Sequence, residues 1–98
     1  MVAATAERDG DTLRVQGDLD FDSVAALWNA TEALFAAGPP ARIDLHGVSR
    51  ANSAGVALLV AWLGRVQRHQ QAVVFVNVPT QMRAIIAVAD LDAVLPLA

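Results

Sequence analysis

The stretch IDLHGVSRANSAGVALLVAWL, residues 43–63, decides the fold because a strand pattern gives way within it to a helix pattern. Its first part alternates, with Ile43 and Leu45 on the buried face of a strand over residues 41–48. From residue 53 the apolar residues recur at helical spacing, which predicts a helix over residues 53–70. The stripe expected to face the core comprises Val56, Leu59, Val60, Leu63 and Val66.

The join between strand and helix is the polar turn Asn52-Ser53-Ala54-Gly55. Asn and Ser are both preferred N-cap residues, and either could accept a hydrogen bond from a free backbone N–H of the first helical turn. A cap alone would explain the residue types. The turn could equally display the Ser53 hydroxyl at the surface, and the sequence leaves both roles open.

The N-terminal part of the chain predicts a hairpin followed by a helix. Asp9-Gly10 is a two-residue hairpin signal, with a short edge strand over Ala4–Arg8 before it and an alternating strand over residues 12–19 after it. In that second strand the residues expected to point outward are Arg14, Gln16 and Asp18. Residues 20–38 then follow helical spacing, with Asp20 or Asp22 as a cap and Gly38-Pro39-Pro40 as the stop. The helical stripe comprises Val24, Leu27, Trp28, Thr31, Leu34 and Phe35.

The C-terminal part predicts one more strand and one more helix. VVFVNV, residues 73–78, is almost wholly apolar, as in a central strand, and Pro79-Thr80 starts a helix that runs to about Leu91. Strands joined by helical crossovers are parallel, and each crossover is right-handed. We therefore expect an α/β fold with a mixed sheet of about four strands, formed by an antiparallel N-terminal hairpin and then parallel strands, with helices mainly on one face.

Composition narrows the class of protein. The chain has 98 residues, a net charge of −3, no cysteine and no block of Lys or Arg, which disfavours nucleic acid and anionic membranes as partners. Its longest uncharged stretch, residues 51–64, is shorter than the roughly 18 residues of a membrane span. These features predict a single domain over residues 1–98, soluble, cytoplasmic and without direct membrane insertion.

No pattern in the chain favours an enzyme. Gly47–Ala51 resembles the G-x-S-x-G turn of hydrolases, but Ala51 replaces the last glycine, and His69 is expected in a helix tail. No lysine follows a glycine as in a phosphate-binding loop, and His46 and His69 lack metal-ligand spacing. We therefore expect no catalytic, cofactor-binding or metal-binding residue.

One flank of the helix over residues 53–70 has two interpretations. Leu58 and Trp62 lie beside the core stripe, on the same side as Arg65 and His69. They could cover the edge of the core under a neighbouring helix, or they could contact a partner, because Trp and Arg are favoured interface anchors. A further arc of small side chains, which would let another helix come close, comprises Ala57, Ala61 and Gly64.

Taken together, these elements resemble the STAS domain (sulphate transporter and anti-sigma factor antagonist) over nearly the whole chain. GDLDFDSVAALW, residues 17–28, is similar to the first-helix segment of the family, and residues 43–63 are similar to its signature. DLDAVLPLA, residues 90–98, is similar to the C-terminus of one branch, the MlaB-type subunit of the bacterial phospholipid-transporting ABC system. Leu27-Trp28 and the closing Val94-Leu95-Pro96 also favour that branch.

The resemblance implies a non-enzymatic regulatory subunit that needs no cofactor. Its expected partner is the ABC transporter ATPase (MlaF type) within a larger membrane complex, so that the chain would be cytoplasmic and peripheral to the inner membrane. The alternative is an anti-sigma factor antagonist, bound and phosphorylated at Ser53 by a serine-kinase anti-sigma factor. Both groups usually carry Asp where this chain has Asn52, which weakens the kinase alternative more than simple docking. The expected partner-binding residues are Asn52, Ser53, Ala54, Gly55, Ala57, Leu58, Ala61, Trp62 and Arg65.

Overall fold

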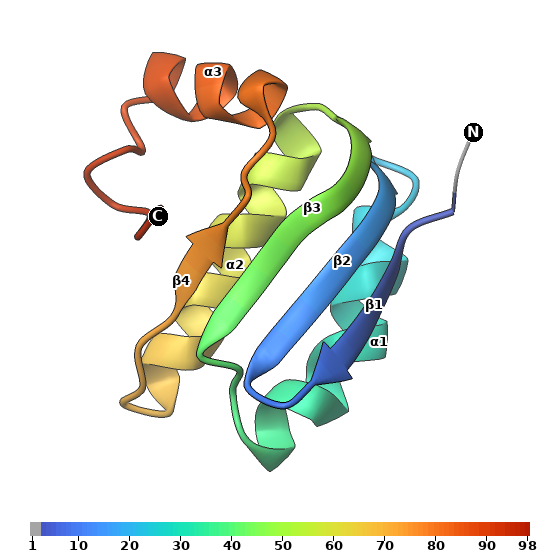
Figure 1. Ribbon diagram of the computed structural model, residues 1–98, viewed down its shortest axis with the longest axis vertical. Helices are drawn as coiled ribbons and strands as arrows, with labels where there is room; N and C mark the ends of the chain where they lie inside the picture. The colour runs from blue at the N-terminus through green and yellow to red at the C-terminus, as the bar shows by residue number, and fades with distance from the viewer. Residues whose placement is uncertain (1–2) are drawn as a thin grey trace.

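A four-stranded sheet in the order β1-β2-β3-β4 forms one layer of the computed structural model, which describes residues 3–98 (Figure 1). β1 pairs with β2 in antiparallel fashion, whereas β2–β3 and β3–β4 are parallel pairs. The predicted mixed sheet is therefore confirmed. The strands are β1 (Thr5–Asp9), β2 (Thr12–Leu19), β3 (Arg42–Ala51) and β4 (Val74–Val76), and the helices are α1 (Val24–Ala37), α2 (Ser53–Arg68) and α3 (Thr80–Val88).

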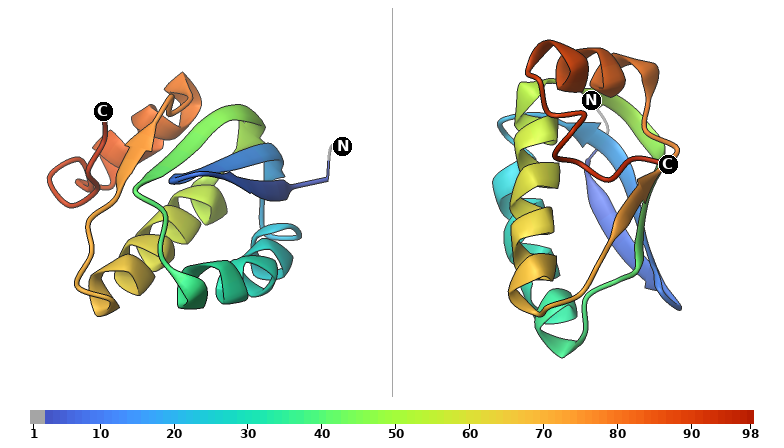
Figure 2. Two further views of the ribbon diagram at one scale, coloured as in Figure 1. Left: turned by 60° about the horizontal axis from the view of Figure 1, so that its bottom comes forward. Right: turned by 90° about the vertical axis from the view of Figure 1, so that its left-hand side faces the viewer.

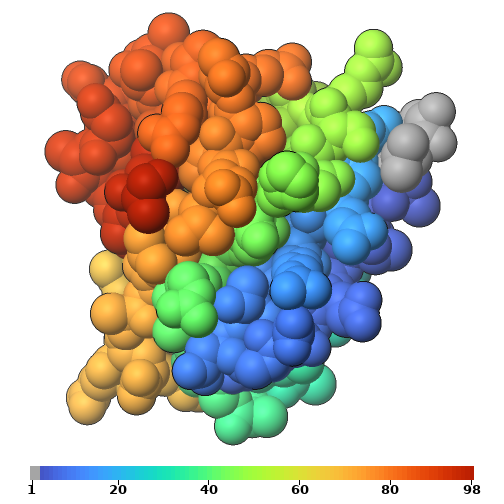
Figure 3. Space-filling model, viewed as in Figure 1, coloured from blue at the N-terminus to red at the C-terminus, as the bar shows by residue number. Residues whose placement is uncertain are grey.

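The helices α1 and α2 lie side by side on one face of the sheet, and α3 lies beyond one end of it (Figure 2). The opposite face of β1, β2 and β3 is not crossed by a helix, so their side chains form the surface seen in Figure 3. Exposed polar residues such as Arg14, Gln16 and His46 belong to these strands. The expectation of helices mainly on one face is confirmed.

The core fills the space between the sheet and the pair α1 and α2. The alternating residues Leu13 and Val15 of β2 and Ile43 and Leu45 of β3 are buried, as the period of two predicts. Trp62 of α2 is also fully buried. Its ring stacks on that of Phe35 of α1, with centroids 6.0 Å apart and planes 14° from parallel.

Two strand features differ from the sequence prediction. Asp9 pairs with Thr12, so the hairpin loop is Gly10-Asp11 rather than Asp9-Gly10, and Gly10 takes the positive φ of 61° that the tight turn requires. Asp18 was expected to point outward but is only 7% exposed. The pairing of β2 with β3 shifts register between Gly17 and Asp18, which ends the simple alternation there.

β4 is shorter than predicted and ends the sheet instead of lying within it. Only Val74–Val76 form the strand, and the prediction of a central strand over residues 73–78 was wrong. The C-terminal tail covers its outer edge: the N–H of Phe75 donates to the carbonyl of Pro96 at 2.9 Å, and the N–H of Ala98 donates to the carbonyl of Phe75 at 3.0 Å. This cover explains why an edge strand can be so apolar.

The helices are also shorter than their sequence patterns. α2 ends at Arg68 rather than residue 70, where Gln70 has a φ of 57°, and α3 ends at Val88 rather than near Leu91. Val60, expected in the core stripe of α2, is 37% exposed. Leu58, on the other side of that stripe, is buried instead, so the buried face of α2 is rotated toward α1 relative to the prediction.

Candidate partner-binding site

The sequence left two roles open for the turn at the start of α2, capping the helix and displaying a hydroxyl, and the structure assigns them to different residues. Asn52 is the N-cap: its side-chain oxygen accepts a hydrogen bond from the N–H of Ala54 at 2.9 Å, and its carbonyl accepts one from the N–H of Gly55 at 3.0 Å. Ser53 is the first helical residue and is exposed. Within residues 3–98 its hydroxyl makes no hydrogen bond, so Asn52 caps the helix and Ser53 is displayed.

The residues that follow Ser53 pack α2 closely onto the sheet. A Cβ atom at Gly55 would lie 3.0 Å from the Cβ of Leu19 and 3.4 Å from that of Ala51, so glycine allows the helix to approach the ends of β2 and β3. Ala54 and Gly55 are buried and Asn52 is half-buried. Gly55 therefore allows the start of α2 to pack against the sheet, while Ser53 is the most exposed residue of this turn.

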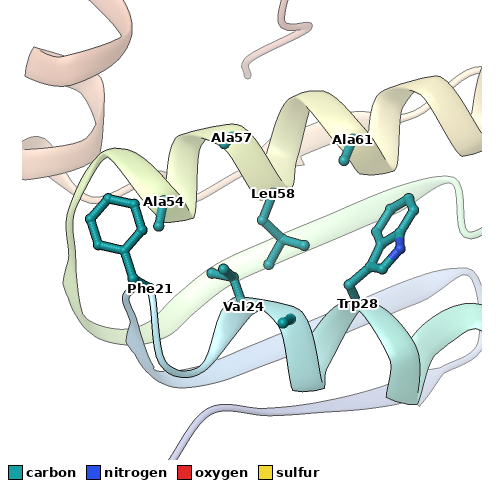
Figure 4. Close-up of a pocket in the computed structure, with 8 residues that line it drawn as sticks. Phe21, Val24, Trp28, Ala54, Ala57, Leu58 and Ala61 are labelled. Carbon is teal, nitrogen blue, oxygen red and sulfur yellow. The ribbon is translucent and has the colours of Figure 1, made fainter.

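An apolar groove opens between α1 and α2, with Ala54, the residue after Ser53, in its lining; it is called here the α1–α2 groove (Figure 4). Its volume is about 360 Å³. Figure 4 shows Phe21 standing at one end near Ala54 and Trp28 at the other end near Ala61, with Leu58 between them. The lining residues are Phe21, Val24, Ala25 and Trp28 from the α1 side and Ala54, Ala57, Leu58 and Ala61 from α2.

The groove unites four of the predicted partner-binding residues with four that the sequence interpretation missed. Ala54, Ala57, Leu58 and Ala61 all line it. The residues on the α1 side were assigned only to a core stripe or to no role. Phe21 carried a signal, because a large aromatic residue between two aspartates fits neither a strand nor a helix pattern, and it is 72% exposed.

Trp62 does not belong to this surface, and its expected place at a partner contact was wrong. It is 0% exposed, and its indole N–H donates to the hydroxyl of Thr31 at 3.1 Å. The Thr31 hydroxyl in turn donates to the carbonyl of Leu27 at 2.9 Å. Leu58 is only 4% exposed and serves as the floor of the groove rather than as a projecting anchor.

Arg65 closes the far end of the groove. Its guanidinium lies 3.0 Å from the centre of the Trp28 ring, and its Nη1 donates to the Trp28 carbonyl at 3.0 Å. Burial lowers the pKa of Arg65, Glu32 opposes this shift, and the neighbouring Arg68 adds to it. An arginine stays protonated in proteins, so Arg65 acts as a fixed cation that holds Trp28 in place.

Two other sequence motifs, the hydrolase-like turn and the region of His46, lie in and beside β3. Gly47–Ala51 lies inside β3 and not on a strand-to-helix turn, so the geometry of a hydrolase elbow is not formed. Asp44 accepts hydrogen bonds from the Asn77 side chain at 3.0 Å and from the N–H of His46 at 2.9 Å. Partial burial raises the pKa of the Asp44 carboxyl, but these hydrogen bonds lower it, so that the pKa lies below its usual value. Over residues 3–98 no cluster of three or more potential ligands could hold a metal ion, and no helix is long and apolar enough to cross a membrane.

Comparison with known proteins finds a matching family model and solved structures with a similar fold. A family model described as "Mlab, STAS domain" matches residues 2–96, while no curated protein matches the chain. An anti-sigma factor antagonist from Mycobacterium paratuberculosis is 27% identical with a TM-score of 0.79, covering 99% of this chain and 85% of that one.

Two further solved structures share the fold at lower identity. An anti-sigma-factor antagonist (STAS) domain protein from Planctomyces limnophilus is 21% identical with a TM-score of 0.72, covering 100% of this chain and 90% of that one. The phosphorylated form of the Bacillus cell fate determinant SpoIIAA is 19% identical with a TM-score of 0.68, covering 98% of this chain and 91% of that one. With its mixed sheet, its displayed serine and a family model that spans nearly all of its length, this chain belongs to the STAS domain family.

Proposed function

We propose that this chain is a non-enzymatic regulatory domain that docks onto one protein partner through Ser53 and the α1–α2 groove. The observation that carries the proposal is the continuity of the two features. Ser53 is exposed and outside the cap, and the next residue, Ala54, already lines the groove. An exposed apolar groove next to a displayed polar group is typical of a protein-binding surface.

The partner that we propose is the ATPase subunit of a bacterial phospholipid-transporting ABC system. The description of the matching family model supports this partner. Both branches usually carry Asp where this chain has Asn52; the amide keeps the cap but removes the charge, which weakens kinase recognition more than it weakens simple docking. In this role the chain would be cytoplasmic and peripheral to the inner membrane, held there by the ATPase and supporting its assembly.

A second candidate is an anti-sigma factor antagonist that is phosphorylated at Ser53. The similar solved structures favour it, since the one at 27% identity is an anti-sigma factor antagonist and another is a phosphorylated form. A phosphate on Ser53 would lie at the N-terminus of α2, where the helix dipole favours negative charge. It would therefore change partner binding without unfolding the domain.

Size-exclusion chromatography separates the two candidates. The chain is mixed in turn with the ATPase of a phospholipid-transporting ABC system from the same organism and with a serine-kinase anti-sigma factor plus ATP, with Ser53→Ala as the control for phosphate incorporation. We expect a stable complex with the ATPase and no transfer of phosphate. A complex with the kinase alone, with phosphate lost in Ser53→Ala, would favour the second candidate. Binding to neither protein would overturn both.

A further inference from the structure

We infer that the α1–α2 groove receives one amphipathic helix of the partner, and that an acidic side chain of this helix meets Arg68 at the far end. The inference rests on the proposed function and deepens it by naming the element of the partner that docks.

The dimensions of the groove suit about two turns of a helix. Figure 4 shows Phe21 near Ala54 and Trp28 near Ala61, and these two alanines are seven residues apart within α2, which along a helix axis corresponds to about 10 Å. A docking helix presents its anchors at positions i, i+3 or i+4, and i+7, which span the same length. The apolar face of such a helix would therefore fit between the two aromatic rings.

The α2 wall allows a helix backbone to come close. Its more exposed residues are Ala57 and Ala61, whereas Ala54 and the larger Leu58 are buried. Helices pack at axial distances that depend on the side chains at the contact, and small residues permit the shorter distances. The groove is closer to an open surface than to an enclosed cavity. An acyl chain lying in it would keep one side in water, whereas a helix would cover the groove and Phe21 together.

The charged residues beyond Trp28 indicate that the docking helix carries an acidic side chain. A second hollow continues the line between the helices and is lined by Glu32, Phe35, Ala36, Arg65, Arg68 and His69. In the described part of the chain the single side-chain ion pair joins Arg14 to Asp9, so neither Arg65 nor Arg68 has a carboxylate at ion-pair distance. Arg65 is held over Trp28, while Arg68 is exposed and bonds only the carbonyl of Gly64 in its own helix. An acidic side chain on the partner would complement Arg68.

Substitutions at exposed positions test the groove without disturbing the core. Ala57→Arg puts a long charged side chain over the middle of the groove, and Val88→Arg puts the same side chain at an exposed position of α3, outside it. Titration calorimetry against the ATPase should show binding weakened at least about 30-fold by Ala57→Arg, as at an interface hot spot. Val88→Arg should bind within about threefold of the parent. Arg68→Glu should weaken binding up to about fivefold, as expected for a rim charge, and Arg68→Lys should not.

Photo-crosslinking from position 61 identifies the occupant directly. With p-benzoylphenylalanine in place of Ala61, we expect a crosslink to a partner helix that has apolar residues at i, i+3 or i+4, and i+7 and an acidic residue at one end. Normal binding by Ala57→Arg would overturn the inference but leave docking through Ser53 intact. A crosslink to a second copy of this chain, or a lipid released from it in native mass spectrometry, would assign the groove to another occupant. If the parent chain forms no complex with the ATPase, the proposed function fails and the inference fails with it.

Discussion

The two halves of α2 face the same neighbour, α1, but the contact is open in one half and sealed in the other. Beside the N-terminal half, alanines leave the α1–α2 groove exposed between the helices. Beside the C-terminal half, Trp62 is fully buried against Phe35 and bonds Thr31, while Arg65 lies across Trp28. The sealed half fixes the spacing of the two helices, and that spacing holds the open half ready to bind a partner without reorganising first.

Stability and partner binding are therefore expected to depend on different halves of α2. Changes in the sealed half should lower the free energy of unfolding, since buried groups lose their packing and their hydrogen bonds. Changes at the exposed positions of the open half should leave folding nearly intact and act on partner affinity. Each of the following experiments could break that division.

Trp62→Ala should have the largest effect on stability. It removes a fully buried ring that stacks on Phe35, and truncations of this kind cost about 3–5 kcal/mol. Thermal unfolding followed by circular dichroism should show a large fall in melting temperature. Trp62→Phe, which keeps an aromatic ring, is the milder control. An unchanged melting temperature together with lost partner binding would show that Trp62 contacts the partner and is not part of the core.

Thr31→Val should have the next largest effect. The substitution keeps the volume but removes the hydroxyl that accepts the Trp62 indole N–H, and an unpaired buried donor costs about 1–3 kcal/mol. Urea unfolding measures the loss. The double variant Thr31→Val/Trp62→Phe removes both partners, so it should lose less than the sum of the two single changes. Strict additivity would show that the hydrogen bond contributes little.

Asn52→Ala should destabilise the domain by about 1 kcal/mol, because it removes the side-chain oxygen that caps α2. Asn52→Asp is the matched control: it keeps an acceptor and adds a negative charge at the helix N-terminus, so it should be as stable as the parent or slightly more stable. Urea unfolding of the pair measures the cap. Equal stability of the alanine and aspartate variants would show that Asn52 does not cap the helix.

Ser53→Ala should have the smallest effect, a change in stability within about 0.5 kcal/mol. The Ser53 hydroxyl is exposed and lies outside the cap, so its removal leaves no buried group unpaired. Urea unfolding beside Asn52→Ala tests this. A loss as large as that of Asn52→Ala would mean that the two residues share the cap.

The sequence predicted the elements that depend on local patterns. Alternation in residues 12–19 and 41–48 predicted β2 and β3, and helical spacing from residue 53 predicted α2, since burial on one face imposes these periods. Topology followed because crossovers between strands constrain their direction. The prediction for β4 failed because its apolar edge is covered by Pro96 and Ala98, a contact that no local pattern reveals.

The candidate site was only half predictable for a related reason. The α2 side of the groove follows from helical geometry, and Ala57, Leu58 and Ala61 were identified from it. The α1 side depends on how far the two helices stand apart, which packing around Trp62 decides. Helical spacing alone could not tell whether Leu58 and Trp62 faced solvent or α1, and the structure buries both.

Comparing the stability and the partner affinity of Ser53→Asp tests the central claim most directly. Aspartate at the first position of α2 suits the helix dipole, so the variant should unfold at the same urea concentration as the parent or a higher one. It also places a charge in the docking turn, where burial without a partner is costly. We predict a stable Ser53→Asp domain that no longer co-elutes with the ATPase. A Ser53→Asp domain that is equally stable and still binds normally would contradict the account, because the partner surface would then lie elsewhere.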